Sequence, residues 1–287
     1  MEMEWIGRLN QAILYIEEQL TNDIDIEELG RITHCSSYHF QRMFGYLAGV
    51  PLSEYIRRRK MSLAAVDLQN GEKVIDVALK YGYSSPTAFH RAFQSVHGRN
   101  PSQMKGTTAF IKSYPPLTFR LTIKGAEEMK YRIEKKDAFR IVGVSCPMYR
   151  DLERNHVNIP KVWDQMAENG LLEKLPKMID TEMKGVLGVC SCMGDEAQWK
   201  YYVSVATTQP AGEMEEYTIP AATWAIFPGN TGNGPIAKAI QEMEQRIISE
   251  WLPSSGYAYA NGPDIEVYLD DNESNMEFEI WIPVCKK

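Results

Sequence analysis

One short helical pattern occurs twice in this chain, at an offset of 49 residues. Residues 38–51 read YHFQRMFGYLAGVP, and residues 87–101 read TAFHRAFQSVHGRNP. Arg42 of the first copy falls on Arg91 of the second, and Gly49 falls on Gly98. In both copies apolar residues recur at i, i+3, i+4 and i+7, which is the spacing of one buried stripe on an α-helix. The repeat therefore predicts two similar amphipathic helices, each with an arginine outside its apolar stripe.

Each of these helices follows a shorter helical segment and a tight turn. Asp25 and Glu28 form a capping-box-like start to the first short segment, and the second, 74–80, runs into a turn that contains Gly82. A short helix, a turn and an amphipathic helix form the helix-turn-helix pattern, whose second helix enters the major groove of DNA. Between the two motifs, residues 51–71 predict a helix of about 18 residues and about 27 Å. That length can hold two groove-reading helices about one turn of DNA apart, about 34 Å.

Polar side chains occupy the outer face of both repeated helices. Arginine reads guanine and glutamine reads adenine through paired hydrogen bonds in the major groove. Four consecutive basic residues, 57–60, also surround the connecting helix, and we expect some to meet phosphate and some to pair with acids of the first helix. The residues predicted to contact DNA are Tyr38, Gln41, Arg42, Arg58, Thr87, His90 and Arg91.

The net charge of −7 is distributed unevenly along the 287 residues. Residues 1–30 hold one Arg against eight acids, residues 31–105 hold eleven Lys and Arg against four acids, and residues 106–287 hold nineteen against twenty-six. A basic block inside an acidic protein indicates a local anionic partner, and the phosphate backbone is the commonest one. The alternative is a solvated basic face, but two matched helices inside the basic block favour double-stranded DNA.

Residues 5–105 resemble the paired helix-turn-helix domain of the AraC/XylS family of transcription regulators. The resemblance is carried by SSYHFQRMF, EYIRRRKM, YGYSSPTAFHRAF and GRNPSQMK. It implies that Tyr38, Gln41 and Arg42, then Thr87 and Arg91, occupy base-facing positions. Pro86 stands where many members carry a polar residue, so the resemblance assigns no base contact there. It also implies two partners, promoter DNA and RNA polymerase, and we expect the regulator to act as an activator in the cytoplasm.

Beyond about residue 129 the hydrophobic period changes from helical to strand-like. Strand patterns in 130–148, 184–193, 198–208, 215–229, 263–270 and 276–284 alternate with helical patterns in 159–170 and 234–252. A strand, a helix and two strands thus occur twice, which predicts two antiparallel sheets, each covered by a helix. We predict an α+β protein with an all-α double helix-turn-helix domain at 1–106, a linker at 107–128 that contains a Pro-Pro pair, and a domain of duplicated β-α-β-β units at 129–287.

The plan of the second half and its ending, DIEVYL…FEIWIPV, resemble the gyrase-inhibitor-like effector-binding domain of regulators of drug response. That resemblance implies a small-molecule pocket, often for bulky aromatic cations, centred on an acidic residue. In residues 276–284 Glu279 and Trp281 share one face of the strand, where charge and cation–π contact would attract an organic cation. Aromatic residues that could line the groove, or alternatively belong to the core, are Trp163, Tyr202, Trp224 and Tyr268.

Other classes of function have weaker sequence support. The N-terminal ten residues lack the pattern of a signal peptide, and no apolar run approaches the roughly 20 residues that a membrane helix needs. The five scattered cysteines suit a reducing cytoplasm, and we predict no metal site, cofactor or catalytic residue. Three alternatives stay open: a hydrolase with Glu279 as general acid or base, a drug-sequestering binder, and a protein-binding decoy without a ligand.

Overall fold

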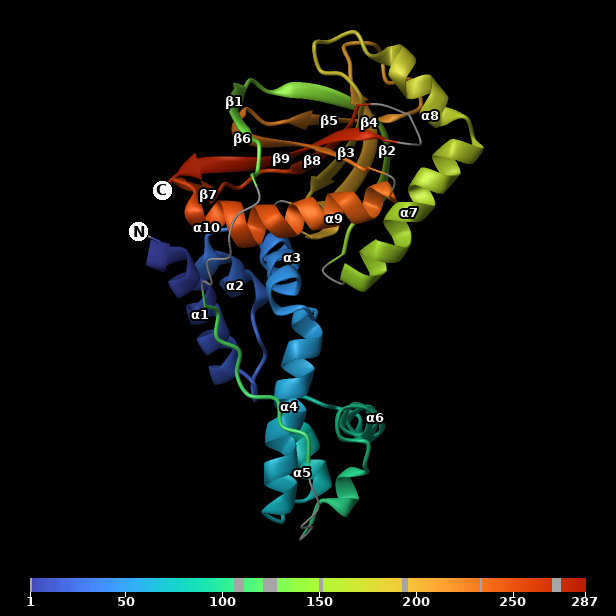
Figure 1. Cartoon of the computed structure of the whole chain (residues 1–287). Coiled ribbons are helices and arrows are strands. Elements are labelled where there is room, and N and C mark those ends of the chain that lie inside the picture. The colour runs from blue at the N-terminus through green and yellow to red at the C-terminus, as the bar shows by residue number, and fades with distance from the viewer. Residues whose placement is uncertain are drawn as a thin grey trace. The chain divides into compact units, whose positions relative to one another are not determined.

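A computed structural model of the chain describes residues 2–105, 111–120, 128–149, 152–192, 196–232, 234–269 and 275–287. Its contacts divide the chain into two units. We call Met1–Thr33 with Phe40–Thr122 unit 1, and His34–His39 with Ile123–Lys287 unit 2. Unit 1 is helical, whereas unit 2 is an antiparallel sheet with helices (Figure 1). The predicted α+β class is confirmed.

Helices in the first part of the chain follow the predicted order. They are α1 (Glu2–Glu18), α2 (Ile26–Thr33), α3 (Ser37–Ala48), α4 (Leu52–Gln69), α5 (Val74–Lys80), α6 (Pro86–His97) and the short 3-10 helix η1 (Pro101–Gln103). The pairs α2–α3 and α5–α6 are the two predicted helix-turn-helix motifs. The connecting helix α4 has the predicted length of 18 residues.

Helix α6 begins and ends as its sequence predicts. The Ser85 side chain accepts a hydrogen bond from the backbone N–H of Ala88 at 3.4 Å, and Pro86 takes the first helical position. Gly98 closes the helix in the left-handed conformation with φ 70°, which glycine adopts without steric cost. Phe89 and Phe93, on the inner stripe, are fully buried.

Arg59 of α4 carries a buried ion pair inside unit 1. Its guanidinium donates to both carboxylate oxygens of Glu17 on α1, at 2.6–3.0 Å, and its side chain is only 8% exposed. Tyr55 donates to the same carboxylate at 2.7 Å. The expectation that part of the basic run pairs with acids of the first helix is therefore confirmed.

Residues 111–120, inside the predicted linker, form neither helix nor strand and are hydrogen-bonded to helices α1 and α4 of the same unit. The amide of Asn10 exchanges two hydrogen bonds with the backbone of Phe119, at 2.8 and 3.1 Å. The backbone N–H of Tyr114 donates to Ser62 at 3.0 Å, and Arg59 donates to the Tyr114 carbonyl. The rest of the predicted linker includes 107–110 and 121–127, which lie outside the described residues.

Unit 2 contains one antiparallel sheet. Its strands are β1 (Arg132–Lys136), β2 (Phe139–Pro147), β3 (Val186–Ser191), β4 (Lys200–Ala206), β5 (Glu215–Ile219), β6 (Ala222–Asn230), β7 (Tyr257–Tyr259), β8 (Asp264–Tyr268) and β9 (Glu277–Lys286). They join in the order β1-β6-β9-β8-β3-β4-β2-β5, and β7 pairs with β9. The prediction of two sheets is wrong, because β3 and β8 pair over Val186–Cys190 and join the two halves.

The two halves also exchange their first strands. β1 precedes the first β-α-β-β unit along the chain but pairs with β6 of the second, with Glu134 opposite Trp224. β5 precedes the second unit but pairs with β2 of the first, with Ile141 opposite Tyr217. The sequence pattern indicated one strand over 215–229, whereas the structure breaks it at Pro220, whose missing N–H cannot join a sheet ladder.

Helices cover one face of this sheet. They are α7 (Leu152–Glu168), α8 (Leu171–Lys174), η2 (Leu175–Met178), η3 (Glu196–Gln198), α9 (Ile236–Arg246), the π-helical turn η4 (Ile247–Trp251) and α10 (Leu252–Ser254). Figure 1 shows α9 lying along the sheet. Phe278, Ile280 and Ile282 of β9 pack with residues of α9, as their alternation predicted. The opposite face, which we call the inner face, carries a second core that includes Trp224 and Trp281.

Gly143 of β2 allows the backbone of the neighbouring strand to approach closely. A Cβ at this position would lie 2.1 Å from the carbonyl oxygen of Val203 and 2.5 Å from the Cα of Ser204. We therefore expect Gly143→Ala to lower the free energy of unfolding of unit 2 by at least about 2 kcal/mol. Urea unfolding followed by tryptophan fluorescence measures this. Gly256→Ala, where a Cβ would meet nothing within 4 Å, is the matched control, and equal losses from both variants would contradict the expectation.

Candidate DNA-binding face and effector site

Helix α6 presents a polar face opposite its buried stripe. Thr87, Arg91 and Gln94 are exposed, and His90 is half-buried. Within the part of the chain that the structure describes, Arg91 forms no hydrogen bond or ion pair. An exposed arginine on the second helix of a helix-turn-helix motif is available to a base edge or a phosphate. The predicted residues of the second motif are therefore on the surface.

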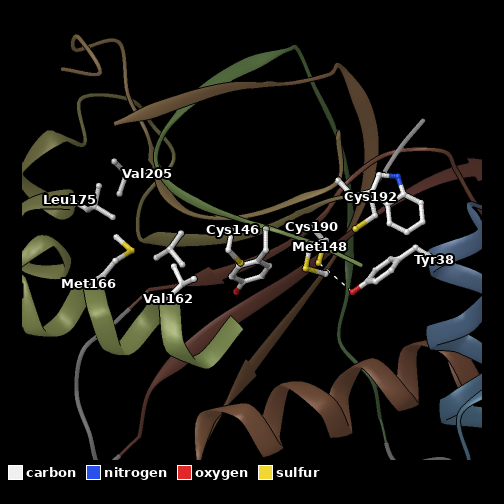
Figure 2. Close-up of a cluster of buried hydrophobic side chains, with 12 residues drawn as sticks. Tyr38, Cys146, Met148, Val162, Met166, Leu175, Cys190, Cys192 and Val205 are labelled. Atoms are coloured by element: carbon white, nitrogen blue, oxygen red, sulfur yellow. Dashed lines mark hydrogen bonds between the residues drawn. The ribbon is translucent and has the colours of Figure 1, made fainter. Parts of the chain in front are cut away.

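Residues 34–39, which include the first residues of α3, belong to unit 2. Tyr38 is 4% exposed, and its ring meets Trp199 edge-on at 5.7 Å between ring centroids. Figure 2 shows Tyr38 at one end of the buried cluster, with its hydroxyl directed at the sulfur of Cys190, 3.7 Å away. Helical spacing alone puts Tyr38 on the outer face of the helix, whereas its side chain is buried here, and its contact with a base stays a prediction.

The other predicted residues of the first motif are partly covered. Gln41 and Arg42 are half-buried and take part in interactions. Arg58 of α4 donates to Glu54 at 2.5 Å, and its guanidinium lies 5.0 Å from the centre of the Tyr114 ring. The side chain of Arg58 remains 33% exposed, so part of the guanidinium is accessible to phosphate.

The six residues predicted to bind the effector do not come together. Tyr202, Trp224 and Trp281 belong to the core of the inner face, and Glu279 lies beside Trp281. Trp163 and Tyr268 are associated with the helix-covered face and contact each other, with 4.9 Å between their ring centroids. The sheet separates the two groups, because alternate residues of a strand point to opposite faces. The six candidates therefore cannot all line one groove, and which of them bind an effector stays a prediction.

A cavity of about 900 Å³ opens near Glu279 and Trp281. Arg132 of β1 binds both oxygens of the Glu279 carboxylate, at 2.7 and 3.1 Å, and the indole N–H of Trp281 donates to it at 2.8 Å. Lys136 lies 5.8 Å from the centre of the Trp281 ring. Arg132 is therefore a counter-ion of the Glu279 carboxylate, and the Lys136 ammonium group lies over the Trp281 ring.

The helix-covered face carries a different acidic and aromatic cluster, centred on Glu266 of β8. Tyr268 and Tyr201 each donate a hydroxyl hydrogen bond to the same oxygen of Glu266, at 2.8 and 3.1 Å. The indole N–H of Trp163 on α7 donates to the Tyr201 oxygen at 3.3 Å. We call Trp163, Tyr201, Glu266 and Tyr268 the Glu266 cluster.

Burial sets the protonation of the two phenols in this cluster. It raises the pKa of Tyr201 well above the usual range, and the negative charge of Glu266 adds to the shift. The pKa of Tyr268 is raised for the same two reasons. Both hydroxyls therefore stay protonated near neutral pH and donate to the carboxylate. Gly188 leaves room for this contact, because a Cβ there would lie 2.3 Å from the Tyr201 oxygen and 2.8 Å from a Glu266 oxygen.

Sequence reasoning missed Glu266 and Tyr201. A usable signal was present in DIEVYLD, where alternation puts Glu266 and Tyr268 on the same face of a strand. Tyr268 was selected as a candidate, but the glutamate two residues before it was not. The β3–β4 pairing that brings Tyr201 close to this position is long-range information that no local pattern contains.

Among the described residues, no three His, Cys, Asp or Glu side chains are grouped as metal ligands. Over the same residues, none of the helices has the length and apolar character needed to span a bilayer. Cys190 and Cys192 are free thiols buried in the cluster of Figure 2.

Two family profiles match the chain, one for each part. The profile described as "Integron-associated effector binding protein" matches residues 132–284, and the profile described as "Helix-turn-helix domain" matches residues 29–107.

Individual proteins resemble the chain over different shares of its length. The HTH-type transcriptional activator AarP of Providencia stuartii is 37% identical over 95 residues, which cover 33% of this chain and 70% of AarP. The right origin-binding protein of Escherichia coli K12 is 22% identical over 305 residues, which cover 98% of this chain and 99% of that protein. A solved bacterial transcription regulation protein from Staphylococcus aureus MU50 has a TM-score of 0.46 and 20% identity, covering 55% of this chain and 99% of its own.

Proposed function

The chain belongs to the AraC/XylS family of transcription regulators and, over residues 132–284, to the integron-associated effector binding proteins, and from this premise we propose how its two parts work. It is a DNA-binding regulator with an effector-binding domain. Helices α6 and α3 read promoter DNA, and the Glu266 cluster takes the effector. The single observation that supports the DNA-reading role best is the exposed polar face of α6.

Specific reading of DNA depends first on Arg91 in this proposal. Its side chain is exposed, lies outside the apolar stripe and is not neutralised by an acid among the described residues. Thr87 lies one helical turn before it, so both can reach the same groove segment. The half-buried Arg42 supplies the second contact. We also propose the domain boundaries: the DNA-binding domain spans residues 1–106, the linker 107–128 and the effector-binding domain 129–287.

Replacing Arg91 by alanine is expected to weaken binding to a specific duplex by about 1–3 kcal/mol, since one base contact is lost. The duplex is first selected from random sequences by the wild-type chain, and affinity is measured by fluorescence anisotropy at fixed salt. Lys238→Ala is the control, because that lysine is 72% exposed on α9 of unit 2. Failure to select any duplex over random sequence, or equal affinities of Arg91→Ala and wild type, would contradict the proposal.

We propose that the effector is a lipophilic organic cation, which would bind among the aromatic side chains of the Glu266 cluster. The half-buried carboxylate of Glu266 accepts hydrogen bonds from two phenols, and the rings of Trp163 and Tyr268 offer π-faces nearby. Charge and cation–π attraction together favour a lipophilic cation over a neutral compound. Glu279, whose carboxylate Arg132 binds on the inner face, is the second candidate.

We further propose that the chain acts as a regulator without catalysis. Compounds incubated with the protein should therefore be recovered intact, as measured by mass spectrometry. RNA polymerase is the partner through which it activates transcription. The protein works in the cytoplasm, where both promoter DNA and RNA polymerase are present.

A further inference from the structure

The cavity beside Trp281, of about 900 Å³, is lined entirely by residues of unit 2. Its apolar floor consists of Trp281 of β9, Val267 of β8, Phe139 of β2 and Met183, which all pack in the core of the inner face. Small-molecule sites in proteins are concave, mostly apolar and about 300–1,000 Å³ in volume. The cavity therefore has the size and the floor of a ligand site.

This cavity is separate from the Glu266 cluster. Val267 of β8 lines the cavity, whereas Glu266 and Tyr268, the residues before and after it, belong to the Glu266 cluster. Successive residues of a strand point to opposite faces of the sheet, so the sheet itself lies between the two places. A ligand in the cavity and a cation at the Glu266 cluster would thus not touch each other.

The charged side chains around the cavity balance one another. Four basic and four acidic residues line it: Arg132, Lys136, Arg140, Lys184, Glu134, Asp137, Glu182 and Glu279. Arg132 binds Glu279 at 2.7 Å and Glu134 at 2.6 Å. Lys136 also binds Glu134, at 2.8 Å, and these two cations hold the pKa of the Glu134 carboxyl below its ordinary value. Arg140 is paired with Glu216 of β5 at 2.6 Å. An ion entering the cavity would therefore find most of the opposite charges already paired.

One wall of the cavity is held in place by its own hydrogen bonds. Thr207 and Thr208 line the cavity, and Asp180 accepts from the Thr207 hydroxyl at 3.0 Å and from the Thr208 backbone N–H at 2.8 Å. Arg140 donates to the carbonyls of Thr207 and Gln209, at 3.1 and 2.8 Å. A wall that is fixed before binding lowers the entropy that a ligand must lose to bind there.

We propose that this cavity is a second ligand site, which takes a neutral, planar aromatic compound. The rings of Trp281 and Phe139 supply aromatic surface, and the paired charges around them offer hydrogen bonds to uncharged polar groups. Burying a charge without a partner is costly, which disfavours a ligand with a net charge. The inference goes beyond the DNA-reading function and beyond the cation proposed for the Glu266 cluster.

A matched pair of fluorescent dyes tests the ligand class on the unmodified chain. N-phenyl-naphthylamine is neutral, and anilinonaphthalene sulfonate is the same ring system with a negative charge. We expect the neutral dye to bind saturably and at least about tenfold more tightly than the sulfonate, because the sulfonate would be buried without a partner. Saturating tetraphenylphosphonium should leave the affinity of the neutral dye unchanged, as measured by fluorescence titration at fixed salt.

A variant at the edge of the cavity tests where the neutral dye binds. Ala138 lines the cavity and is exposed in the turn between β1 and β2, so Ala138→Trp adds bulk there without entering the core. It is expected to weaken binding of the neutral dye at least about tenfold, since atoms forced into a filled space are costly. Ala167→Trp, at an exposed position of α7, is the matched control and should leave the affinity of the dye unchanged.

Each arm has a result that would overturn the inference. These results are a sulfonate that binds as tightly as the neutral dye, displacement of the neutral dye by tetraphenylphosphonium, and equal affinities of Ala138→Trp and Ala167→Trp. Absence of saturable binding of the neutral dye would overturn it as well. If tetraphenylphosphonium binds nowhere on the chain, the cation proposal fails, and the comparison of the two alanine variants still decides the cavity.

Discussion

Replacing Glu266 by glutamine is expected to lower affinity for a lipophilic cation, such as tetraphenylphosphonium, at least about tenfold. Truncating or neutralising one partner of a desolvated charge pair typically costs about 2–5 kcal/mol, and glutamine keeps the size of the side chain while removing the charge. Its amide can still accept a hydrogen bond from Tyr201 or Tyr268, so the fold should persist. Isothermal titration calorimetry of the full chain measures the loss.

Glu279→Gln is the matched control for this experiment. Glu279 has the same chemistry on the neighbouring strand β9, but its carboxylate is bound by Arg132 at 2.7 Å. We expect Glu279→Gln to change cation affinity by less than about threefold, since Glu279 lies on the opposite face of the sheet from the Glu266 cluster. If Glu279→Gln caused the larger loss, the effector would bind at the cavity beside Trp281 and not at the Glu266 cluster.

Replacing Arg59 by methionine is expected to lower the free energy of unfolding of unit 1 by about 3 kcal/mol. Removing one partner of a buried ion pair leaves the other charge without compensation, which typically costs about 3–5 kcal/mol. Among the described residues Glu17 would then keep only the hydroxyl of Tyr55 as a donor, and the carbonyl of Tyr114 would lose the donor Arg59. Urea unfolding followed by circular dichroism at the helix band measures the change.

Arg57→Met on the same helix is the control. Arg57 forms an ion pair with Glu54 three residues before it, but its side chain is 45% exposed. Exposed pairs contribute about 0.2–1 kcal/mol at most, so this variant should unfold close to wild type. Equal destabilisation by the two variants would show that Arg59 acts through general helix packing and not through its buried pair.

Local patterns predicted the helices of the first part of the chain well. The i, i+3, i+4 spacing, the Ser85 cap and the closing Gly98 are each readable within a dozen residues, and each appears in α6 as expected. The duplicated β-α-β-β order was predictable for the same reason. Period and turn signals report local structure, and helices in particular depend mainly on local sequence.

Long-range placement could not be read in the same way. No pattern around Tyr38 shows that its ring meets Trp199, 161 positions later in the chain numbering. The partner of Glu279 is Arg132 of β1. The local pattern could not show that β1 pairs with β6 of the second β-α-β-β unit, next to the strand of Glu279. Choosing between Glu266 and Glu279 required knowledge of which face the helices cover, because both glutamates alternate with apolar residues on strands of similar sequence.

The exchange of first strands between the two halves of unit 2 has a consequence for assembly of the domain. Neither half can complete its own sheet, because β1 supplies an edge to the later half and β5 supplies one to the earlier half. A nascent chain that ends before β6 has no partner for β1, so β1 stays unpaired until β6 has been synthesised. Cutting the chain between Thr208 and Glu213 should therefore yield fragments that are unstable alone and regain structure only when mixed.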